Sequence, residues 1–280
     1  MNLIIKELKT LADPKRAQNL QRFFKTGKGE YGEGDLFLGL KVPQVRQIVK
    51  KYWKDTNLVK AEELLHNKYH EVRLCALLIL VEKFKNSEKS AKKIHNVIAS
   101  DHRERGNPLV VASPDKSSGR GNLSKIASLP AHRNDERIKD HIFQIYINNT
   151  KYINNWDLVD QSAGYIVGQY LADKPKGLLY KFAKSKSLWE RRIAVISTLY
   201  FIVFKQESKE TIKIAKILLH DPHDLIHKAV GWMLREVGKR VDEKILTDFL
   251  DQHYKTMPRT MLRYSIERLG EDKRRFYLNR

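Results

Sequence analysis

Apolar residues recur at positions i, i+3, i+4 and i+7 along almost the whole chain, with polar residues between them. The pattern is clearest in residues 71–84, 188–204 and 225–237. This spacing puts apolar side chains on one face of a helix, whereas a half-buried strand alternates at every second residue. Gly and Pro gather mainly in connecting stretches such as residues 27–34, 173–177 and 221–222. The sequence therefore predicts an all-α protein.

The helical segments resemble one another at regular intervals. Each has a basic residue ahead of a small or apolar run, as at Arg73, Arg192, Lys228 and Arg259. Arg192 and Lys228 are 36 residues apart, and Lys228 and Arg259 are 31 apart. Such periods, with two helices in each unit, are typical of α-solenoids of the HEAT or armadillo kind. We predict one domain over residues 1–280, an α-α superhelix of HEAT-like repeats whose concave face is available for binding.

One stretch breaks this rhythm. Arg73 and Arg192 are 119 residues apart, and residues 99–140 are dense in Gly, Pro, Ser and Asn. Removing about 45 residues would leave about 74, which is two units. We predict that residues 99–140 are an inserted, mostly irregular and mobile loop with its two ends close together. A functional binding loop is the alternative, because eight Lys and Arg lie between Arg103 and Lys139.

Composition changes the picture through charge. The chain has 53 Lys and Arg against 33 Asp and Glu, a formal net charge of +20. This excess favours a polyanionic partner, nucleic acid first and an anionic membrane surface second, although a generally basic proteome would produce it too. Because the cations are spread through the helical segments and form no tail, we expect them to make the concave face basic.

Several classes are excluded or disfavoured. A single cysteine, Cys75, excludes a disulfide framework and a thiolate metal cluster. No apolar run approaches the roughly 18 residues of a membrane span. The amphipathic start MNLIIKELKT makes a signal peptide unexpected. Although His220, His223 and His227 have a spacing that could bracket a metal, no carboxylate motif accompanies them. We expect a cytoplasmic protein without metal, cofactor or membrane association.

The most informative local cluster is the segment NNWDLVD at residues 154–160. On a helix that begins near Asn155, Trp156 and Asp160 are four residues apart and share one face. Asp157 falls in the first helical turn, where a carboxylate can accept free backbone N–H groups. A purely structural interpretation makes Asp157 a cap, Trp156 a core residue and Asp160 a solvated acid.

Repeat phase argues for a functional interpretation. Trp156 precedes Arg192 by 36 residues, the interval that also separates Arg192 from Lys228, and Trp232 is one helical turn beyond Lys228. Equal phase in a solenoid means alignment along one face. We therefore expect a row of tryptophans, cations and the Asp160 carboxylate in a basic groove, where indole faces pack on sugars or bases and cations hold phosphates. The surrounding cations should keep Asp160 ionised.

A fixed carboxylate in such a groove suits the cleavage of an N-glycosidic bond. This reaction develops positive charge on the deoxyribose, in an oxocarbenium-like transition state. A carboxylate near C1′ stabilises that charge and can orient a water molecule. A leaving base that is already cationic through alkylation needs no general acid. One carboxylate is then sufficient, in keeping with a sequence that has no evident second catalytic acid.

Four stretches resemble the DNA alkylation repair family, the AlkD-type DNA glycosylases built of HEAT-like repeats. They are FLGLKVPQVRQ at 37–47, NWDLVD at 155–160, LWERRIA at 188–194 and KAVGWMLRE at 228–236. The resemblance implies an enzyme that excises N3- and N7-alkylated purines from double-stranded DNA without flipping the base. It implies no cofactor, no obligate protein partner and action as a monomer, in a bacterial-type cytoplasm where the bound protein associates with the nucleoid.

The resemblance also implies roles for particular residues. Asp160 matches the catalytic aspartate of the family, and Trp156 and Trp232 match the tryptophans that flank it along the deoxyribose backbone. Arg192 matches an arginine that holds phosphate near the lesion. The further DNA contacts implied are Lys239, seven residues after Trp232, and three cations within the matching stretches, which are Arg46, Lys228 and Arg235.

Two features depart from the family pattern. Val42 stands where the family often has a polar residue, so one DNA contact is lost, and the inserted segment is not typical. Two other functions stay open: a DNA-binding solenoid without catalytic activity, and a protein-interaction solenoid with an acidic partner. The net charge and the complete tryptophan–aspartate set argue against the latter.

Overall fold

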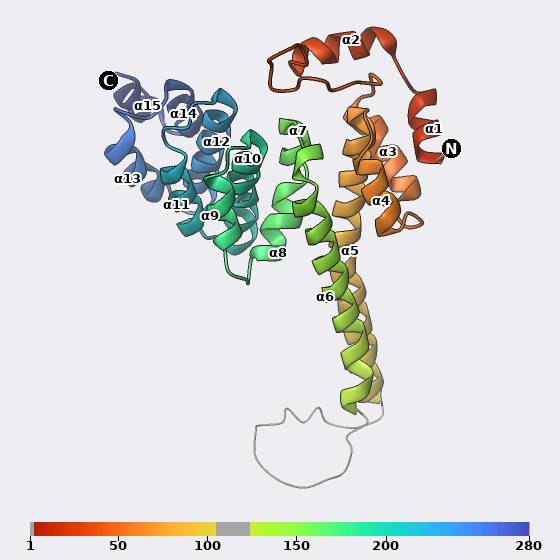
Figure 1. The fold of residues 1–280 in the computed structure, drawn as a ribbon. Helices are drawn as coiled ribbons and strands as arrows, with labels where there is room; N and C mark the ends of the chain where they lie inside the picture. The colour runs from red at the N-terminus through yellow and green to blue at the C-terminus, as the bar shows by residue number, and fades with distance from the viewer. Residues whose placement is uncertain (1–2, 105–123, 280) are drawn as a thin grey trace.

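A computed structural model describes the backbone of residues 3–104 and 124–279, and their side chains except those of residues 88–134. In this part of the chain the regular structure is helical, and the only strand-like pairing is an isolated bridge between Leu36 and Tyr69. The helices form two layers that progress from the N-terminus to the C-terminus, and the two ends lie on opposite sides of the molecule (Figure 1). The prediction of an all-α superhelix is confirmed.

The N-terminal part precedes the first long helices. Its helices are α1 (Leu3–Thr10), α2 (Pro14–Phe23), α3 (Val42–Tyr52) and α4 (Leu58–Leu65). Helix α2 begins at a strong signal, because Asp13 accepts the backbone N–H of Arg16 and Pro14 occupies the first helical position. The irregular segment 24–41 between α2 and α3 crosses the top of the molecule in Figure 1.

Two long helices follow, α5 (His70–Glu104) and α6 (Ser124–Asn148), and they pack side by side. Their far ends project away from α2 and from the short helix α7 (Trp156–Asp160), as Figure 1 shows. The prediction of a mostly irregular insert over residues 99–140 is therefore wrong at both ends, because 99–104 continue α5 and 124–140 belong to α6. Residues 105–123 of the predicted insert lie outside the described part of the chain.

The physical reason for this difference lies in the apolar residues near the end of the predicted insert. Ile138, Ile142 and Ile145 keep the helical spacing, and the last two are almost fully buried in the core. A long helix is stabilised mainly by burying such a face against a neighbour. A high content of Gly, Pro and Ser therefore argues against a helix only in the middle of the segment. The residues on either side of it can be helical because they have a partner helix to pack against.

The C-terminal part begins after α6. Its first elements are η1 (Thr150–Tyr152), α7, the π-helical turn η2 (Gly164–Gly168), α8 (Gln169–Leu171), α9 (Gly177–Ala183), α10 (Leu188–Ser197) and a second π-helical turn η3 (Phe201–Lys205). The remaining helices are α11 (Lys209–Ile217), α12 (Asp224–Arg240), α13 (Glu243–His253), α14 (Arg259–Ser265) and α15 (Glu271–Leu278).

An inner layer runs through the whole molecule. Helix α3 contacts α5, α5 contacts α7, α7 contacts α10, α10 contacts α12 and α12 contacts α14. An outer layer packs against these helices, with α4 on α5, α9 on α10, and α11 and α13 on α12. One continuous cluster of buried apolar side chains lies between the layers. Residues of equal phase on successive inner helices therefore face the same side.

One glycine is required where the inner helices α12 and α14 pack against each other. A Cβ atom at Gly231 of α12 would lie 2.5 Å from Cβ of Tyr264 and 2.6 Å from the carbonyl oxygen of Met261, both on α14. Contacts this short cannot exist in a packed interior. Gly231 thus sets the distance between α12 and α14, and with it the position of Trp232 next in the chain. Among the described helices, none is both long enough and apolar enough to cross a membrane.

Candidate active site

A groove of about 700 Å³ opens on the inner layer, and we call it the central groove. Six of the eight residues predicted from the sequence line it: Trp156, Asp160, Arg192, Lys228, Trp232 and Arg235. The other lining residues are Phe23, Lys25, Tyr31, His223, Asp224, Leu225 and Tyr264. The alignment expected from the 36-residue period is therefore present, on α7, α10 and α12.

The Asp160 carboxylate is held from one side by Arg192. Nε of Arg192 donates to Oδ1 at 2.9 Å, and Nη2 donates to Oδ2 at 2.8 Å. This two-pronged geometry fixes both the position and the plane of the carboxylate. The third prong, Nη1, donates to the backbone carbonyl of Leu225 at the start of α12. The Asp160 side chain keeps 16% of its surface exposed, so it faces the groove and is not sealed beneath it.

The contacts of the Arg192 side chain are not those that the resemblance implies. Its side chain is only 5% exposed, and its guanidinium is taken up by Asp160 and the Leu225 carbonyl. The sequence-based expectation gave this arginine to a DNA phosphate. In the structure it is the partner that orients the groove carboxylate, and its contact with a phosphate stays a prediction.

The acidity of Asp160 also differs from the expectation. Burial of the carboxyl raises its pKa above the ordinary value of 3.8, and the ion pair with Arg192 opposes that rise. The negative charge of Asp157, three residues earlier, adds to the rise. The sequence suggested that surrounding cations would dominate, but a single cation contacts this carboxylate and burial outweighs it.

Trp156 is the first residue of α7 and lies half-buried at the groove wall. Its ring stacks on Phe24 with centroids 5.3 Å apart and meets the edge of Phe23 at 6.1 Å. Phe23 is 63% exposed at the end of α2, so an aromatic surface continues from the groove onto solvent. These ring contacts fix the indole at the groove wall.

The short helix α7 is anchored by a buried charge network. Asn155 caps the start of the helix by accepting the backbone N–H of Trp156. Asp157 accepts the backbone N–H of Leu158 through Oδ1. Its other oxygen, Oδ2, lies 2.8 Å from Nε2 of His70. The structural interpretation made Asp157 a simple cap. The described contacts show that it also bonds to the first residue of α5, which ties α7 to another inner helix.

The same histidine joins a second carboxylate. Nδ1 of His70 lies 3.2 Å from Oδ2 of Asp35, and Arg73 donates to the other oxygen of Asp35 at 2.6 Å. His70 is 2% exposed. Burial alone would lower its pKa, but the carboxylates of Asp157 and Asp35 outweigh burial and raise the pKa of His70 to about 9. The imidazole is therefore protonated near neutral pH and neutralises Asp157 directly behind the groove.

Glu71, beside this histidine, fixes the first family-like stretch. Its carboxylate accepts the backbone N–H groups of Leu38, Gly39 and Leu40 at 2.8–3.1 Å. These three amides would otherwise lie buried without partners, at a cost of about 1–3 kcal/mol each. The contact places the loop ahead of α3 against α5, beside the groove.

The remaining predicted cations are distributed unevenly. Lys228 forms an ion pair with Asp224 at 2.8 Å, and Arg235 pairs with Glu267 and Glu236. Arg46 does not line the central groove and donates to the side chain of Gln161 at 2.9 Å, next to Asp160 in the chain. Lys239 also lies outside the groove lining, exposed near the end of α12, and its seven-residue spacing from Trp232 puts both on one helical face.

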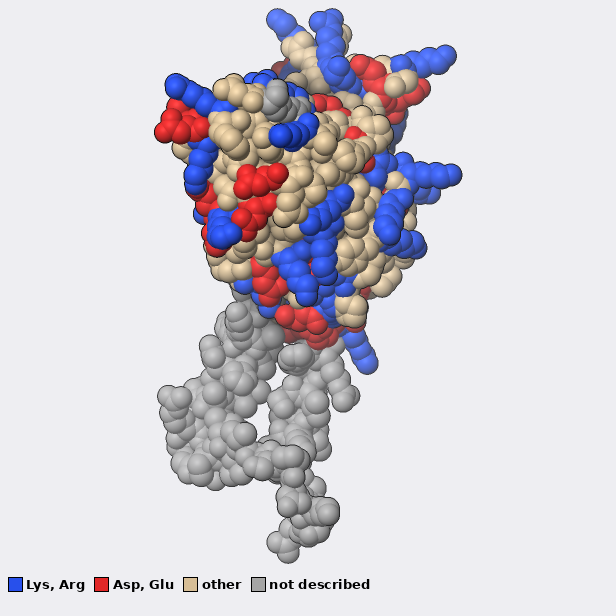
Figure 2. Space-filling view, turned by 90° about the vertical axis from the view of Figure 1, so that its left-hand side faces the viewer, with Lys and Arg blue, Asp and Glu red and all other residues tan. Residues whose placement is uncertain are grey.

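Because of these ion pairs, the groove is less positively charged than the net charge of the chain suggests. Three of its four cations, Arg192, Lys228 and Arg235, contact carboxylates, and Lys25 is the fourth. The end of the molecule formed by the C-terminal helices likewise shows Lys and Arg interspersed with Asp and Glu (Figure 2). The cations are therefore positioned by acidic partners and do not form a uniform basic sheet.

Sequence reasoning missed several lining residues. Tyr264 lies 36 residues after Lys228, so one more step of the period would have found it. Phe23, Lys25 and Tyr31 come from the irregular N-terminal segment, where no periodicity gives a signal. Tyr31 reaches the far wall, with its ring 6.0 Å from Trp189 of α10 and 6.2 Å from His223 at the start of α12.

Comparison with known proteins agrees with this architecture. The sequence matches the family model described as "DNA alkylation repair enzyme" over residues 4–103 and 118–269. The unmatched residues 104–117 fall within the predicted insert. A solved structure described as a predicted DNA alkylation repair enzyme from Enterococcus faecalis has the same fold, with a TM-score of 0.59, 14% identity, and coverage of 93% of this chain and 97% of that one. No curated protein matches the chain significantly.

Proposed function

Because the chain belongs to the DNA alkylation repair enzyme family, we propose that it is a DNA glycosylase that removes N3- and N7-alkylated purines from duplex DNA without flipping the base. The observation that carries the proposal is the carboxylate of Asp160, which Arg192 holds at two points in a groove that stays open to solvent. A DNA strand would fit in a groove of this kind. The fixed negative charge of the carboxylate would then lie against the strand.

In the proposed reaction, Asp160 faces the deoxyribose of the alkylated nucleotide. Positive charge grows on the sugar as the bond to the cationic purine breaks, and the carboxylate stabilises it. The pair of contacts from Arg192 keeps the carboxylate from reorienting during the reaction. Trp156 and Trp232 line the same groove and would pack along the sugar–phosphate backbone. The departing base leaves neutral, so no general acid is required of the groove.

The direct test is incubation with methylated duplex DNA followed by mass analysis of the released bases. We expect 3-methyladenine or 7-methylguanine to appear with the wild-type protein. Asp160→Asn removes the charge but keeps the size of the side chain, and should slow release about 100-fold or more while DNA binding persists.

Asp224→Asn is the matched control. It neutralises another carboxylate in the same groove, where Asp224 pairs with Lys228 and lies 53% exposed. We expect this variant to keep releasing bases, because Asp224 has no bidentate partner that fixes it. Equal losses in both variants would exclude a specific role for Asp160, and tight binding without any release would favour a non-catalytic DNA-binding protein.

A further inference from the structure

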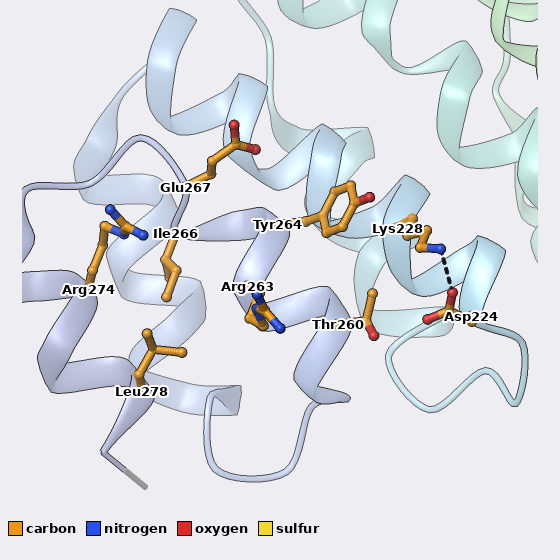
Figure 3. Close-up of a pocket in the computed structure, with 9 residues that line it drawn as sticks. All are labelled: Asp224, Lys228, Thr260, Arg263, Tyr264, Ile266, Glu267, Arg274 and Leu278. Atoms are coloured by element: carbon orange, nitrogen blue, oxygen red, sulfur yellow. Dashed lines mark ion pairs between the residues drawn. The ribbon is translucent and has the colours of Figure 1, made fainter.

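A second cavity, of about 570 Å³, lies beside the central groove, and we call it the C-terminal cavity. It is enclosed by residues of α12, α14 and α15 and of the segment between the last two, including Arg263 and Arg274 (Figure 3). Asp224, Lys228 and Tyr264 line both spaces. The two spaces are therefore neighbours, with these three side chains in the walls of both.

The acidic residues of the C-terminal cavity already have cationic partners. Asp224 pairs with Lys228, and Glu267 pairs with Arg235 on the groove side. Their negative charges are thus compensated before any ligand arrives. The cations that remain for a ligand are Arg263 and Arg274, which lie on α14 and α15.

Both arginines are available to an anion. Arg263 is exposed, and it forms no ion pair within the described residues. Arg274 is 44% exposed, and its one ion pair within the described part of the chain is with Glu271, 3.9 Å away and also bonded to Arg275. In Figure 3, Arg274 enters from the side opposite Lys228, with Arg263 and the hydroxyl of Thr260 between them. Phosphate oxygens accept hydrogen bonds from guanidinium groups placed around a shared space, whereas the Thr260 hydroxyl is already hydrogen-bonded to Asp224.

We propose that the C-terminal cavity binds the backbone phosphates of the DNA strand that leaves the central groove, with Arg263 and Arg274 as the contacting residues. This inference rests on the proposed function, since it takes DNA as the occupant of the groove. In this role the cavity holds the DNA strand in position beyond the alkylated nucleotide. Asp160 does not line the cavity. The cavity therefore contributes to DNA binding, and the glycosidic bond is cleaved in the central groove.

The test compares the salt dependence of binding to two unmodified duplexes, one helical turn and two helical turns long. Each phosphate neutralised contributes about 0.9 to the slope of log affinity against log salt concentration. Arg263→Gln should lower the slope by about 0.9 on the longer duplex and by no more than this on the shorter one. Arg274→Gln should act in the same direction.

Arg268→Gln is the matched control, because Arg268 is exposed in the segment between α14 and α15 but does not line the cavity. Its slope should equal that of the wild type. Equal slopes for Arg263→Gln and Arg268→Gln would overturn the inference while base release by the wild type keeps the proposed function intact. A melting temperature raised by inorganic phosphate in the wild type but not in Arg263→Gln, together with equal salt slopes of the two proteins on the longer duplex, would identify a free-anion site and overturn the strand assignment. Failure of the wild type to bind either duplex would overturn both proposals.

Discussion

The Nε2 atom of His70 lies 2.8 Å from Oδ2 of Asp157, three residues before the groove carboxylate Asp160. The contact joins the first residue of α5 to the first turn of a five-residue helix. A helix this short has little stability of its own. Its place in the groove therefore depends on this buried charge pair and on the Asn155 cap.

The His70 pair predicts a loss of stability at alkaline pH. The folded-state pKa of His70, about 9, is above the ordinary value of 6.5. Its contribution to stability is therefore fully present below pH 6.5 and is lost as the pH rises through about 9. The melting temperature of the wild type should fall across this range. In His70→Gln it should start lower and change less, and parallel curves for the two proteins would refute the assignment.

The Arg192–Asp160 pair predicts a pH dependence of base release. Burial raises the pKa of Asp160, so single-turnover release should decline on acidification at a higher pH than an ordinary aspartate would cause. Removing the opposing cation in Arg192→Gln should move this decline to still higher pH. Arg191→Gln is the control, because Arg191 is on the same helix as Arg192, α10, but pairs with Asp221. A pH–rate profile that shifts equally in both variants would contradict the orienting role of Arg192.

Gly231→Ala should destabilise the protein by about 1–3 kcal/mol, because the added methyl group meets Tyr264 and the Met261 carbonyl across the α12–α14 contact. Gly177→Ala at the start of α9 is the control, since an added Cβ atom there has nothing within 4 Å. Chemical denaturation measures both. Equal stability of the two variants would show that α12 and α14 can move apart freely.

Lys239→Gln should weaken DNA binding and lower the salt slope by about 0.9, because Lys239 shares a helical face with Trp232 and would contact one phosphate. Lys181→Gln removes the same charge from α9 of the outer layer, where Lys181 is exposed. Titration of a labelled duplex at several salt concentrations compares the two. An unchanged slope in Lys239→Gln would remove this residue from the interface.

The sequence predicted the helical fold and much of the groove, because both depend on periodicity. The interval of 36 residues puts Trp156, Arg192 and Lys228 on successive inner helices, and helix packing then aligns them. The pairing of Asp157 with His70 could not be predicted, since 87 residues separate them and neither belongs to a repeated position. The ion pair between Arg192 and Asp160 was missed for a related reason. Equal phase in the repeats predicts which residues lie close together but not which of them form hydrogen bonds.

The two walls of the central groove come from distant parts of the chain, Phe23 to Tyr31 on one side and Lys228 to Tyr264 on the other. In stacked helical arrays the terminal units open most easily. Fraying at either end would take the groove apart while the middle helices stay folded. Warming or mild denaturant should thus abolish ligand affinity while most of the helical circular dichroism remains, so a preparation with a strong helical signal can already have lost its ability to bind.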